Sequence, residues 1–469
     1  MMQVGTADNP LRVAVIGSGP AGFYVAEHLL SRDDLVVEVD MYERLPTPYG
    51  LVRFGVAPDH EKIKNVTRTF DKKTGGHPRF QFFGNVEIGT HIRLEDLRRH
   101  YHQICFASGA QTDRRMGIPG EDLKRSHPAT EFVAWYNGHP DFCHCEFDLS
   151  VEHVAVVGVG NVAVDVARIL CRTPDELAKT DIADYALEQL RESKVREVSM
   201  LGRRGPAQAA FTNPEVRELG QMPGADIAVV PQEVALDPLS QEEVDASDNR
   251  LLRKKLEILN EFTTRGRSDK PKVLTIRFLV SPVELYGDQQ GRVSGMRIVK
   301  NALYRDEKGS LRPRATDQFE DLPAQMVFRS VGYHGVAIPG LPFHDRWGIV
   351  PNEDGRVVDA ATGPVAGTYV SGWIKRGPTG VIGTNKPDAA ETVNAMVSDV
   401  QEGRCPPPPQ PHREAAAQLV AERQPDFVSY QDWKRIEALE NRRGEPHGRP
   451  RVKFTTVRDA LDALRDGRP

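Results

Sequence analysis

The chain contains one strand–loop–helix pattern twice, and this repeat constrains its fold more than any other feature. The first loop, Gly17 to Gly22, follows an apolar run over residues 12–16, and the second, Gly158 to Ala163, follows residues 153–157. Apolar helical patterns continue to about residues 30 and 170, and further strands are predicted over residues 36–42 and 195–201. The sequence therefore predicts an α/β chain with two Rossmann-like dinucleotide-binding domains.

The first loop has the glycines that a dinucleotide needs. Gly17 permits the tight turn, Gly19 lets the backbone approach a pyrophosphate, and Gly22 lets the helix pack closely on the strand. Glu43 ends the next strand, 21 residues after Gly22. A carboxylate there accepts hydrogen bonds from ribose hydroxyls and repels a 2′-phosphate. This loop is predicted to bind FAD or NAD, and not NADP.

The second loop is followed by arginines where the first is followed by an acid. The strand ending at Leu201 leads into Arg203 and Arg204. Guanidinium groups pair well with a phosphate dianion, which favours NADP. Loop and arginines are about twice the usual ~20 residues apart. We attribute the excess to an insertion over residues 172–194.

Composition excludes several classes of protein. A length of 469 residues predicts two or three domains, and a net charge of −5 argues against a nucleic-acid binder. No run approaches the ~18–20 apolar residues of a membrane span. Residues 1–10 carry no signal or Arg-rich presequence, so we expect a short disordered lead in a cytoplasmic protein of bacterial type.

The cysteines indicate a reducing compartment. There are five, without a Cys-x-x-Cys pair, which argues against a disulfide reductase. Cys143 and Cys145 flank His144, but no second ligand pair lies at metal spacing, and we expect no metal site.

Two nucleotide sites restrict the chemistry. A nicotinamide carries two electrons as hydride, and a flavin accepts them and releases them singly. We therefore expect a protein that transfers electrons from NADPH through FAD. The alternatives are a monooxygenase, an NADPH–flavin reductase with another acceptor, and a non-catalytic nucleotide-binding scaffold.

Several longer segments resemble adrenodoxin-reductase-type ferredoxin–NADP reductases. They are residues 45–60, 158–168, 202–206, 372–385 and 444–453, within a resemblance that runs from about residue 11 to 465. The resemblance implies a fold of the glutathione-reductase kind, with a discontinuous FAD domain and an inserted NADP domain. The implied boundaries are 1–111 and 341–469 for the two FAD parts, with the tail in the second, and 112–340 for the NADP domain.

The resemblance also implies site residues, in addition to the loop glycines Gly17, Gly19 and Gly22. The implied FAD contacts are Ala21, Glu43, Leu51, Val86, Trp373, Gly380, Val381 and Ile382. The implied NADP contacts are Gly160, Asn161, Val162, Ala163, Arg203, Arg204, Glu215 and Gly380. Gly380 would lie where nicotinamide and flavin meet. From the residues alone, Gly380 also suits an ordinary turn and Trp373 also suits core packing.

His60 and Glu215 are the candidate catalytic residues. The resemblance places the histidine near the flavin and the acid near the nicotinamide. Hydride transfer requires positioning rather than a general acid, so we assign both residues positioning and electrostatic roles, with proton transfer by His60 as a hypothesis. The alternative is that Asp59 caps a helix that His60 begins.

The implied partner is a ferredoxin, an acidic iron–sulfur protein, including one that serves a cytochrome P450. A basic docking face is expected, and Arg217, Arg250, Arg253 and Lys254 are candidates. The last three would lie outward on a helix over residues 251–262, with Leu251, Leu252, Leu256, Ile258, Leu259 and Phe262 on its apolar face. A merely solvated face is the alternative. We expect no nucleic-acid partner, and a monomer or weak dimer.

Overall fold

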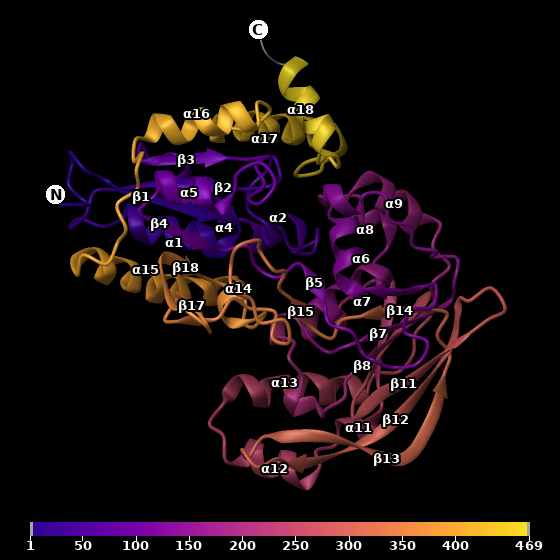
Figure 1. Cartoon of the computed structure of the whole chain (residues 1–469). Coiled ribbons are helices and arrows are strands. Elements are labelled where there is room, and N and C mark those ends of the chain that lie inside the picture. Colours follow the sequence, from indigo (N-terminus) through magenta and orange to yellow (C-terminus); the bar gives the residue numbers. More distant parts are fainter. Residues whose placement is uncertain (1–2, 467–469) are drawn as a thin grey trace.

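Two sheets organise the chain, whose residues 3–466 the computed structural model describes (Figure 1). The first sheet has the order β16 (Asn352–Glu353), β17 (Arg356–Asp359), β18 (Gly363–Val370), β4 (Gln103–Phe106), β1 (Leu11–Ile16), β2 (Val37–Tyr42), β3 (Phe80–Phe83). Strands β18 to β3 are parallel, and β16 and β17 run antiparallel. Strands from both ends of the chain share this sheet, as a discontinuous domain requires.

The second sheet is formed by the middle of the chain and is parallel throughout. Its order is β6 (Ser126–Pro128), β14 (Met326–Arg329), β7 (His153–Val157), β8 (Glu197–Leu201), β10 (Lys272–Arg277), β9 (Ala225–Val229). An antiparallel sheet of β11 (Val280–Gly287), β12 (Val293–Arg305) and β13 (Leu311–Leu322) extends from this lobe (Figure 1). The inserted second domain is thus a continuous segment between the two parts of the first.

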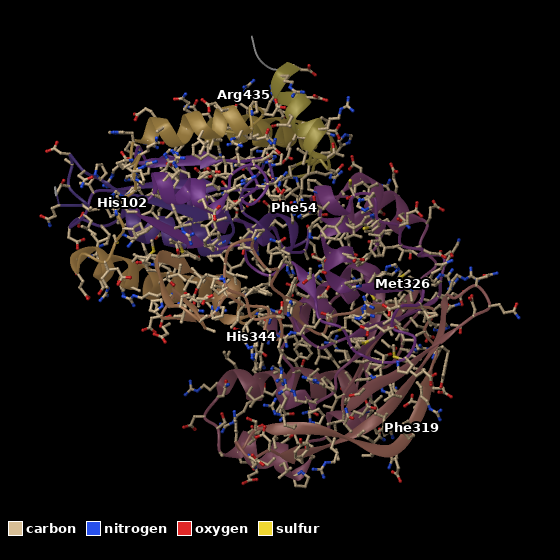
Figure 2. All side chains as sticks on the ribbon, viewed as in Figure 1. Phe54, His102, Phe319, Met326, His344 and Arg435 are labelled. Atoms are coloured by element: carbon tan, nitrogen blue, oxygen red, sulfur yellow. The ribbon has the colours of Figure 1, made fainter. Side chains whose placement is uncertain are left out.

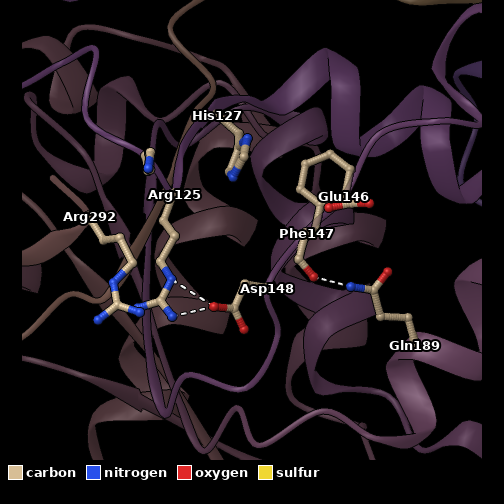
Figure 3. A pocket seen from close by; sticks show the side chains of 8 residues that line it. Arg125, His127, Glu146, Phe147, Asp148, Gln189 and Arg292 are labelled. Atoms are coloured by element: carbon tan, nitrogen blue, oxygen red, sulfur yellow. Dashed lines mark hydrogen bonds and ion pairs between the residues drawn. The ribbon is translucent and has the colours of Figure 1, made fainter. Parts of the chain in front are cut away.

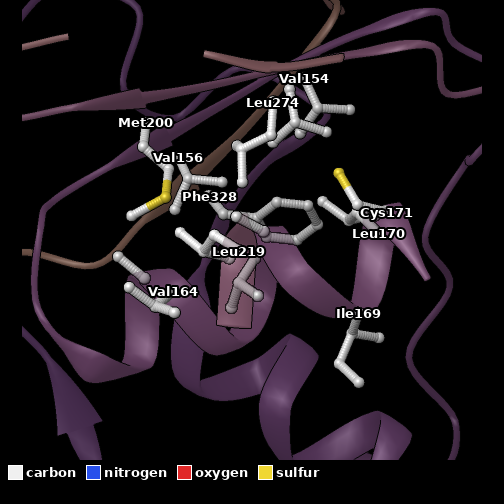
Figure 4. Close-up of a cluster of buried hydrophobic side chains, with 14 of the residues drawn as sticks. Val154, Val156, Val164, Ile169, Leu170, Cys171, Met200, Leu219, Leu274 and Phe328 are labelled. Carbon is white, nitrogen blue, oxygen red and sulfur yellow. The ribbon is translucent and has the colours of Figure 1, made fainter. Parts of the chain in front are cut away.

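Each glycine loop leads into a largely buried helix, α1 (Pro20–Leu30) or α7 (Asn161–Cys171). Figure 4 shows part of the second core, in which Val164, Leu170 and Cys171 of α7 share one cluster with Val154 and Met200 of the sheet. Burying a valine, isoleucine or methionine side chain contributes about 1.5–3 kcal/mol. These contacts hold each loop at the carboxyl end of its parallel strands, where α/β folds bind ligands.

Further helices complete the two lobes. They are α2 (Leu51–Phe54), α3 (Glu61–Lys64), α4 (Val66–Phe70), α5 (Leu94–His100), α6 (Ala129–Tyr136), α8 (Pro174–Leu177), α9 (Asp184–Arg191), α10 (Asn213–Leu219), α11 (Pro231–Val234), α12 (Pro238–Asp245), α13 (Arg250–Thr263), α14 (Trp373–Arg376) and α15 (Asn385–Gln401). Within residues 3–466, no helix has the length and apolar character needed to cross a bilayer.

The two chain crossings between the lobes lie side by side. Strand β5 (Thr112–Asp113) pairs antiparallel with β15 (Tyr333–His334). The ring of Phe54, which lies between the lobes in Figure 2, packs on His139 with centroids 4.8 Å apart. Backbone pairing and aromatic packing therefore both join the lobes.

The C-terminal tail also bridges the lobes. Helices α16 (Arg413–Arg423), α17 (Tyr430–Gly444) and α18 (Val457–Asp466) lie over the first lobe (Figure 1). Between α17 and α18, Arg449 Nε donates to Thr180 O at 2.8 Å and Lys453 Nζ to Asn137 O at 2.8 Å. The tail is thus largely helical within the described residues, and residues 467–469 lie outside them.

Two local expectations are wrong. Residues 3–10 form hydrogen-bonded turns rather than a disordered lead, because Gly5 N donates to Asn9 O at 2.8 Å and Gly5 O accepts from Val36 N at 2.7 Å; residues 1–2 lie outside the described chain. Leu251, expected on the apolar face of α13, is 72% exposed. It lies in the first turn, before Leu256, Ile258, Leu259 and Phe262 reach the core.

Candidate functional site

The first loop is closed toward the protein and open on its other side. Gly17 has φ +105°, and a Cβ there would lie 2.6 Å from Ala107 O. A Cβ on Gly22 would lie 2.0 Å from Gly17 O, whereas one on Gly19 would meet nothing within 4 Å. Gly17 and Gly22 are therefore required by the fold itself. The open space beside Gly19 fits a pyrophosphate on the N-terminus of α1.

Glu43 turns its carboxylate into this loop. Its Oε2 accepts from Ser18 Oγ at 2.7 Å and from Ser18 N at 3.2 Å, and its Oε1 accepts from Leu45 N at 3.1 Å. Tyr49 N donates to Ser18 O at 2.9 Å and brings Leu51 beside the loop, where it is 37% exposed. An acid thus lies at the position expected to contact ribose hydroxyls.

The segment after β18 covers the start of α1. A Cβ on Gly372 would lie 2.6 Å from Ala21 Cβ. Trp373 is half-buried and packs on Tyr333, with ring centroids 5.1 Å apart, rather than lying in a core. Val381 is 52% exposed, and Ile382 packs on the first-lobe core.

Two of the residues implied as FAD contacts also have roles in the fold itself. Gly380 has φ +80°, and a Cβ would lie 2.3 Å from Thr384 Oγ1, so the turn itself requires glycine. Val86 has a buried side chain, and its N–H donates to Glu43 O at 2.8 Å.

The second loop has the same steric features as the first. Gly158 has φ +141°, and a Cβ would lie 2.3 Å from Ser330 O, whereas a Cβ on Gly160 would meet nothing within 4 Å. Asn161 Oδ1 accepts from Thr212 N at 2.9 Å, Val162 is half-buried, and Ala163 is fully buried. The open space again lies where a pyrophosphate would approach a helix N-terminus.

The arginines that follow β8 lie beside this loop despite the long sequence interval. Helices α8 and α9 occupy the extra residues, and β8 remains the direct neighbour of β7, with Val157 paired to Leu201. Arg203 is exposed and Arg204 is half-buried. Burial, followed by the guanidinium groups of Arg203 and Arg312, lowers the pKa of Arg204. Positive charge is crowded here, which suits a phosphate dianion.

His60 and Glu215 come together between the lobes. His60 Nδ1 lies 3.8 Å from Glu215 Oε1 and 4.0 Å from Asp165 Oδ1, and Nε2 lies 2.9 Å from Glu218 Oε2. Burial lowers the pKa of His60, but the hydrogen bond to Glu218 and the nearby Asp165 and Glu215 carboxylates outweigh it and raise the pKa. The imidazole is thus biased toward its charged form.

Asp59 is not a helix cap. His60 occupies the position before α3, without a side-chain cap, and Asp59 instead pairs across the lobes with Arg168 at 2.8 Å and Arg172 at 2.5 Å. Burial raises the pKa of Asp59, but these two arginines outweigh it and hold the pKa well below its usual range.

Sequence reasoning missed five residues of these clusters. They are Asp165, Arg168, Arg172, Glu218 and Arg312. The sequence does carry a signal for the first two, because they are charged residues three apart in a predicted apolar helix. It carries none for Arg312, which reaches Arg204 only through the antiparallel sheet.

A hollow of about 540 Å³ lies elsewhere on the second lobe (Figure 3). It is lined by Lys124, Arg125, His127, Glu146, Phe147, Asp148, Gln189 and Arg292. Arg125 Nε donates to Asp148 at 3.0 Å, and Arg292 Nε to Asp288 at 2.8 Å. The arginines are thus paired within the protein, and the lining contains none of the expected site residues.

Two open glycine loops on two parallel sheets, one facing an acid and the other facing arginines, define a two-domain dinucleotide-binding reductase. Residues 11–204 match the pyridine nucleotide-disulphide oxidoreductase family. The chain belongs to the adrenodoxin-reductase-type ferredoxin–NADP reductases. This membership confirms the resemblance, the fold class and the expectation of an FAD- and NADP-dependent oxidoreductase.

Two relatives and one solved structure match this chain over nearly their whole length. NADPH-ferredoxin reductase FprA of Mycobacterium tuberculosis is 45% identical over 460 residues, which cover 96% of this chain and 98% of the relative. The mitochondrial NADPH:adrenodoxin oxidoreductase of Arabidopsis thaliana is 39% identical, with 97% and 96% covered. The solved structure of M. tuberculosis FprA in complex with NADPH has a TM-score of 0.91 at 44% identity, covering 97% of this chain and 100% of that one.

Proposed function

We propose that this chain passes electrons from NADPH through FAD to a ferredoxin. The observation that carries the proposal is the inequality of the two loops, with Glu43 turned into the first and Arg203 and Arg204 beside the second. His60 and Glu215 approach each other between them. FAD, when bound, supplies the conversion of a two-electron hydride donor into a one-electron donor.

We further propose which residues hold each cofactor. FAD is held by Gly17, Gly19, Ala21, Gly22, Glu43, Leu51, Val86, Trp373, Gly380, Val381 and Ile382. NADP is held by Gly160, Asn161, Val162, Ala163, Arg203, Arg204, Glu215 and Gly380. The open sides of Gly19 and Gly160 support both assignments. The domain division is 1–111 with 341–469 for FAD and 112–340 for NADP, which the strand order supports.

His60 and Glu215 position the reacting groups and set the charge around them. Nε2 of His60 donates to Glu218, so the ring orientation is held from the second lobe. Proton movement at His60 Nδ1 or Nε2 remains a hypothesis that the variant below tests.

An anaerobic titration tests the function. NADPH should bleach the yellow protein quickly, NADH should do so poorly, and added ferredoxin should restore the colour as it is reduced. A flavin that NADPH does not bleach would indicate a non-catalytic scaffold. Oxygen uptake tied stoichiometrically to an organic substrate would indicate a monooxygenase.

The acidic partner is proposed to dock on the exposed residues Arg217, Arg250, Arg253 and Lys254 of α10 and α13. Exposed Leu251 adds an apolar contact among these charges. Rising ionic strength should slow ferredoxin reduction but leave reduction of a neutral quinone unchanged. Equal salt dependence for both acceptors would contradict this face. We propose a monomer or weak dimer, testable by sedimentation, and a cytochrome P450 as one final acceptor.

Replacing His60 with Gln should slow flavin reduction by NADPH about tenfold to 100-fold. Glutamine is uncharged and does not reproduce the position of the ring that contacts Glu218. Anaerobic stopped-flow absorbance measures this rate directly. His447→Gln, at an exposed position, is the control and should react like the wild type. An unchanged rate in His60→Gln would remove His60 from the catalytic site.

A further inference from the structure

Arg168 is a fully buried cation in the mostly apolar helix α7. Its guanidinium meets Asp59 twice, with Nε at 2.8 Å from Oδ2 and Nη2 at 3.1 Å from Oδ1. Nη2 also donates to Asp165 Oδ1 at 2.7 Å, and Nη1 donates to Glu215 Oε2 at 3.2 Å. One side chain therefore joins carboxylates from both lobes.

A buried guanidinium group lowers the stability of the fold unless its charge is compensated. A buried ion loses several kcal/mol of hydration unless good partners compensate it, and hydrophobic replacements are often as stable. The carboxylates need the cation in turn, since Asp165 is buried and burial raises its pKa to about 6. A planar fork with five donors serves several carboxylates at once, which an ammonium group does less well.

We propose that Arg168 is a positioning residue that sets the orientation and the tautomer of His60 and holds Glu215 beside it. The inference rests on the proposed function, because that function gives His60 and Glu215 their roles in positioning the reacting groups. Arg168 Nη2, whose two hydrogens are directed mainly at Asp59 and Asp165, also lies 3.4 Å from His60 Nδ1 and turns positive charge toward the lone pair of that nitrogen. A guanidinium only donates, so in the neutral ring Nδ1 accepts and the proton lies on Nε2. That proton is directed at Glu218 Oε2, 2.9 Å away.

The charges around His60 come from three directions. Glu215 and Glu218 face it from α10, Asp165 and Arg168 face it from α7, and Asp59 precedes it in its own segment. Arg168 is the cation among these groups. Without it, the carboxylates would hold the imidazolium more tightly, and His60 would titrate at higher pH.

The experiment uses the FAD-loaded enzyme with ¹⁵N-labelled histidines and no NADPH. Arg168→Met should raise the titration midpoint of His60 by about one pH unit or more, because a charge within a few ångströms is removed. Ring-nitrogen shifts should change from the Nε2–H form to a mixture of tautomers. The His60 signal is identified by its loss in His60→Gln.

Arg172→Met is the matched control. Arg172 directly follows the last residue of α7, four residues after Arg168, and also pairs with Asp59, at 2.5 Å, but its other ion pair is with Glu176. It should leave both the His60 midpoint and the tautomer unchanged. An unmoved midpoint and tautomer in Arg168→Met, or an equal change in Arg172→Met, would overturn the proposal.

Arg168→Lys covers the case in which the methionine variant does not fold. It keeps the charge and loses the fork, so the midpoint should stay close to wild type. A single ammonium nitrogen cannot serve Asp59, Asp165 and Glu215 and also face His60 Nδ1, so the tautomer bias should be lost. Flavin reduction by NADPH should fall about tenfold at every pH, because the pair is held less well. Wild-type tautomer and rate in Arg168→Lys would refute the inference. A wild-type enzyme that NADPH does not bleach would refute the proposed function alone, since the ¹⁵N measurements need no NADPH.

Discussion

Alanine at both Arg203 and Arg204 is expected to lower kcat/KM for NADPH about 100- to 1000-fold and to leave that for NADH nearly unchanged. A charge-assisted hydrogen bond contributes about 1.5–3 kcal/mol, and solvent-accessible ones lie in the lower part of that range, so two arginines on one phosphate together supply about 3–4 kcal/mol. At 1.4 kcal/mol per tenfold, that is about 100- to 1000-fold. The crowded charge of Arg203, Arg204 and Arg312 supports a phosphate at this point. NADH has no 2′-phosphate and gains nothing from it.

Steady-state rates with both nucleotides measure this effect. Arg196→Ala is the control, because Arg196 immediately precedes the opposite end of β8 and is 67% exposed. It should change neither value. Equal losses for NADPH and NADH in the double variant would show that the arginines stabilise the domain rather than select the nucleotide.

Valine at Gly19 is expected to give a folded, colourless protein. The backbone at Gly19 has φ −74° and ψ −177°, which valine adopts without strain, and a Cβ there would meet no protein atom within 4 Å. The added methyl groups would occupy the space for the pyrophosphate. A clash of about 3 kcal/mol would weaken FAD binding more than about 100-fold.

Gly160→Val is the complementary variant. Its backbone, at φ −103° and ψ 177°, is equally tolerant and its Cβ direction is equally open. This variant should keep its bound flavin and stay yellow, but NADPH should no longer reduce that flavin. Flavin absorbance, circular dichroism and NADPH titration separate the two variants, and each is the control for the other. Full FAD content in Gly19→Val, or normal bleaching in Gly160→Val, would contradict the loop assigned to that cofactor.

Much of the fold followed from local patterns. The strand expected over 153–157 is β7 without change, and the helix expected over residues 251–262 is α13, Arg250–Thr263. The glycines that the fold itself requires could also be predicted, since few residues other than glycine fit a tight turn before a helix. Leu251 was misplaced because a helical period does not say where the core beneath the helix ends.

The candidate site was predicted in part. Resemblance implied His60 and Glu215, and the structure brings them to 3.8 Å. The closer carboxylate, Glu218, is 158 residues from His60 along the chain and lay outside any motif used. Asp59 was given a local role as a possible cap, whereas its partners are on the other lobe, 109 and 113 residues away.

The sequence by itself determined two nucleotide loops, their order, and the opposite charge that follows each. Those features depend on backbone sterics and residue type within a few tens of residues. Only the tertiary structure decided which ions meet: Arg168 with Asp59, His60 with Glu218, and Arg312 with Arg204. Such charges meet where separate helices and sheets pack, and electrostatic interactions between distant segments leave no periodic trace in the chain.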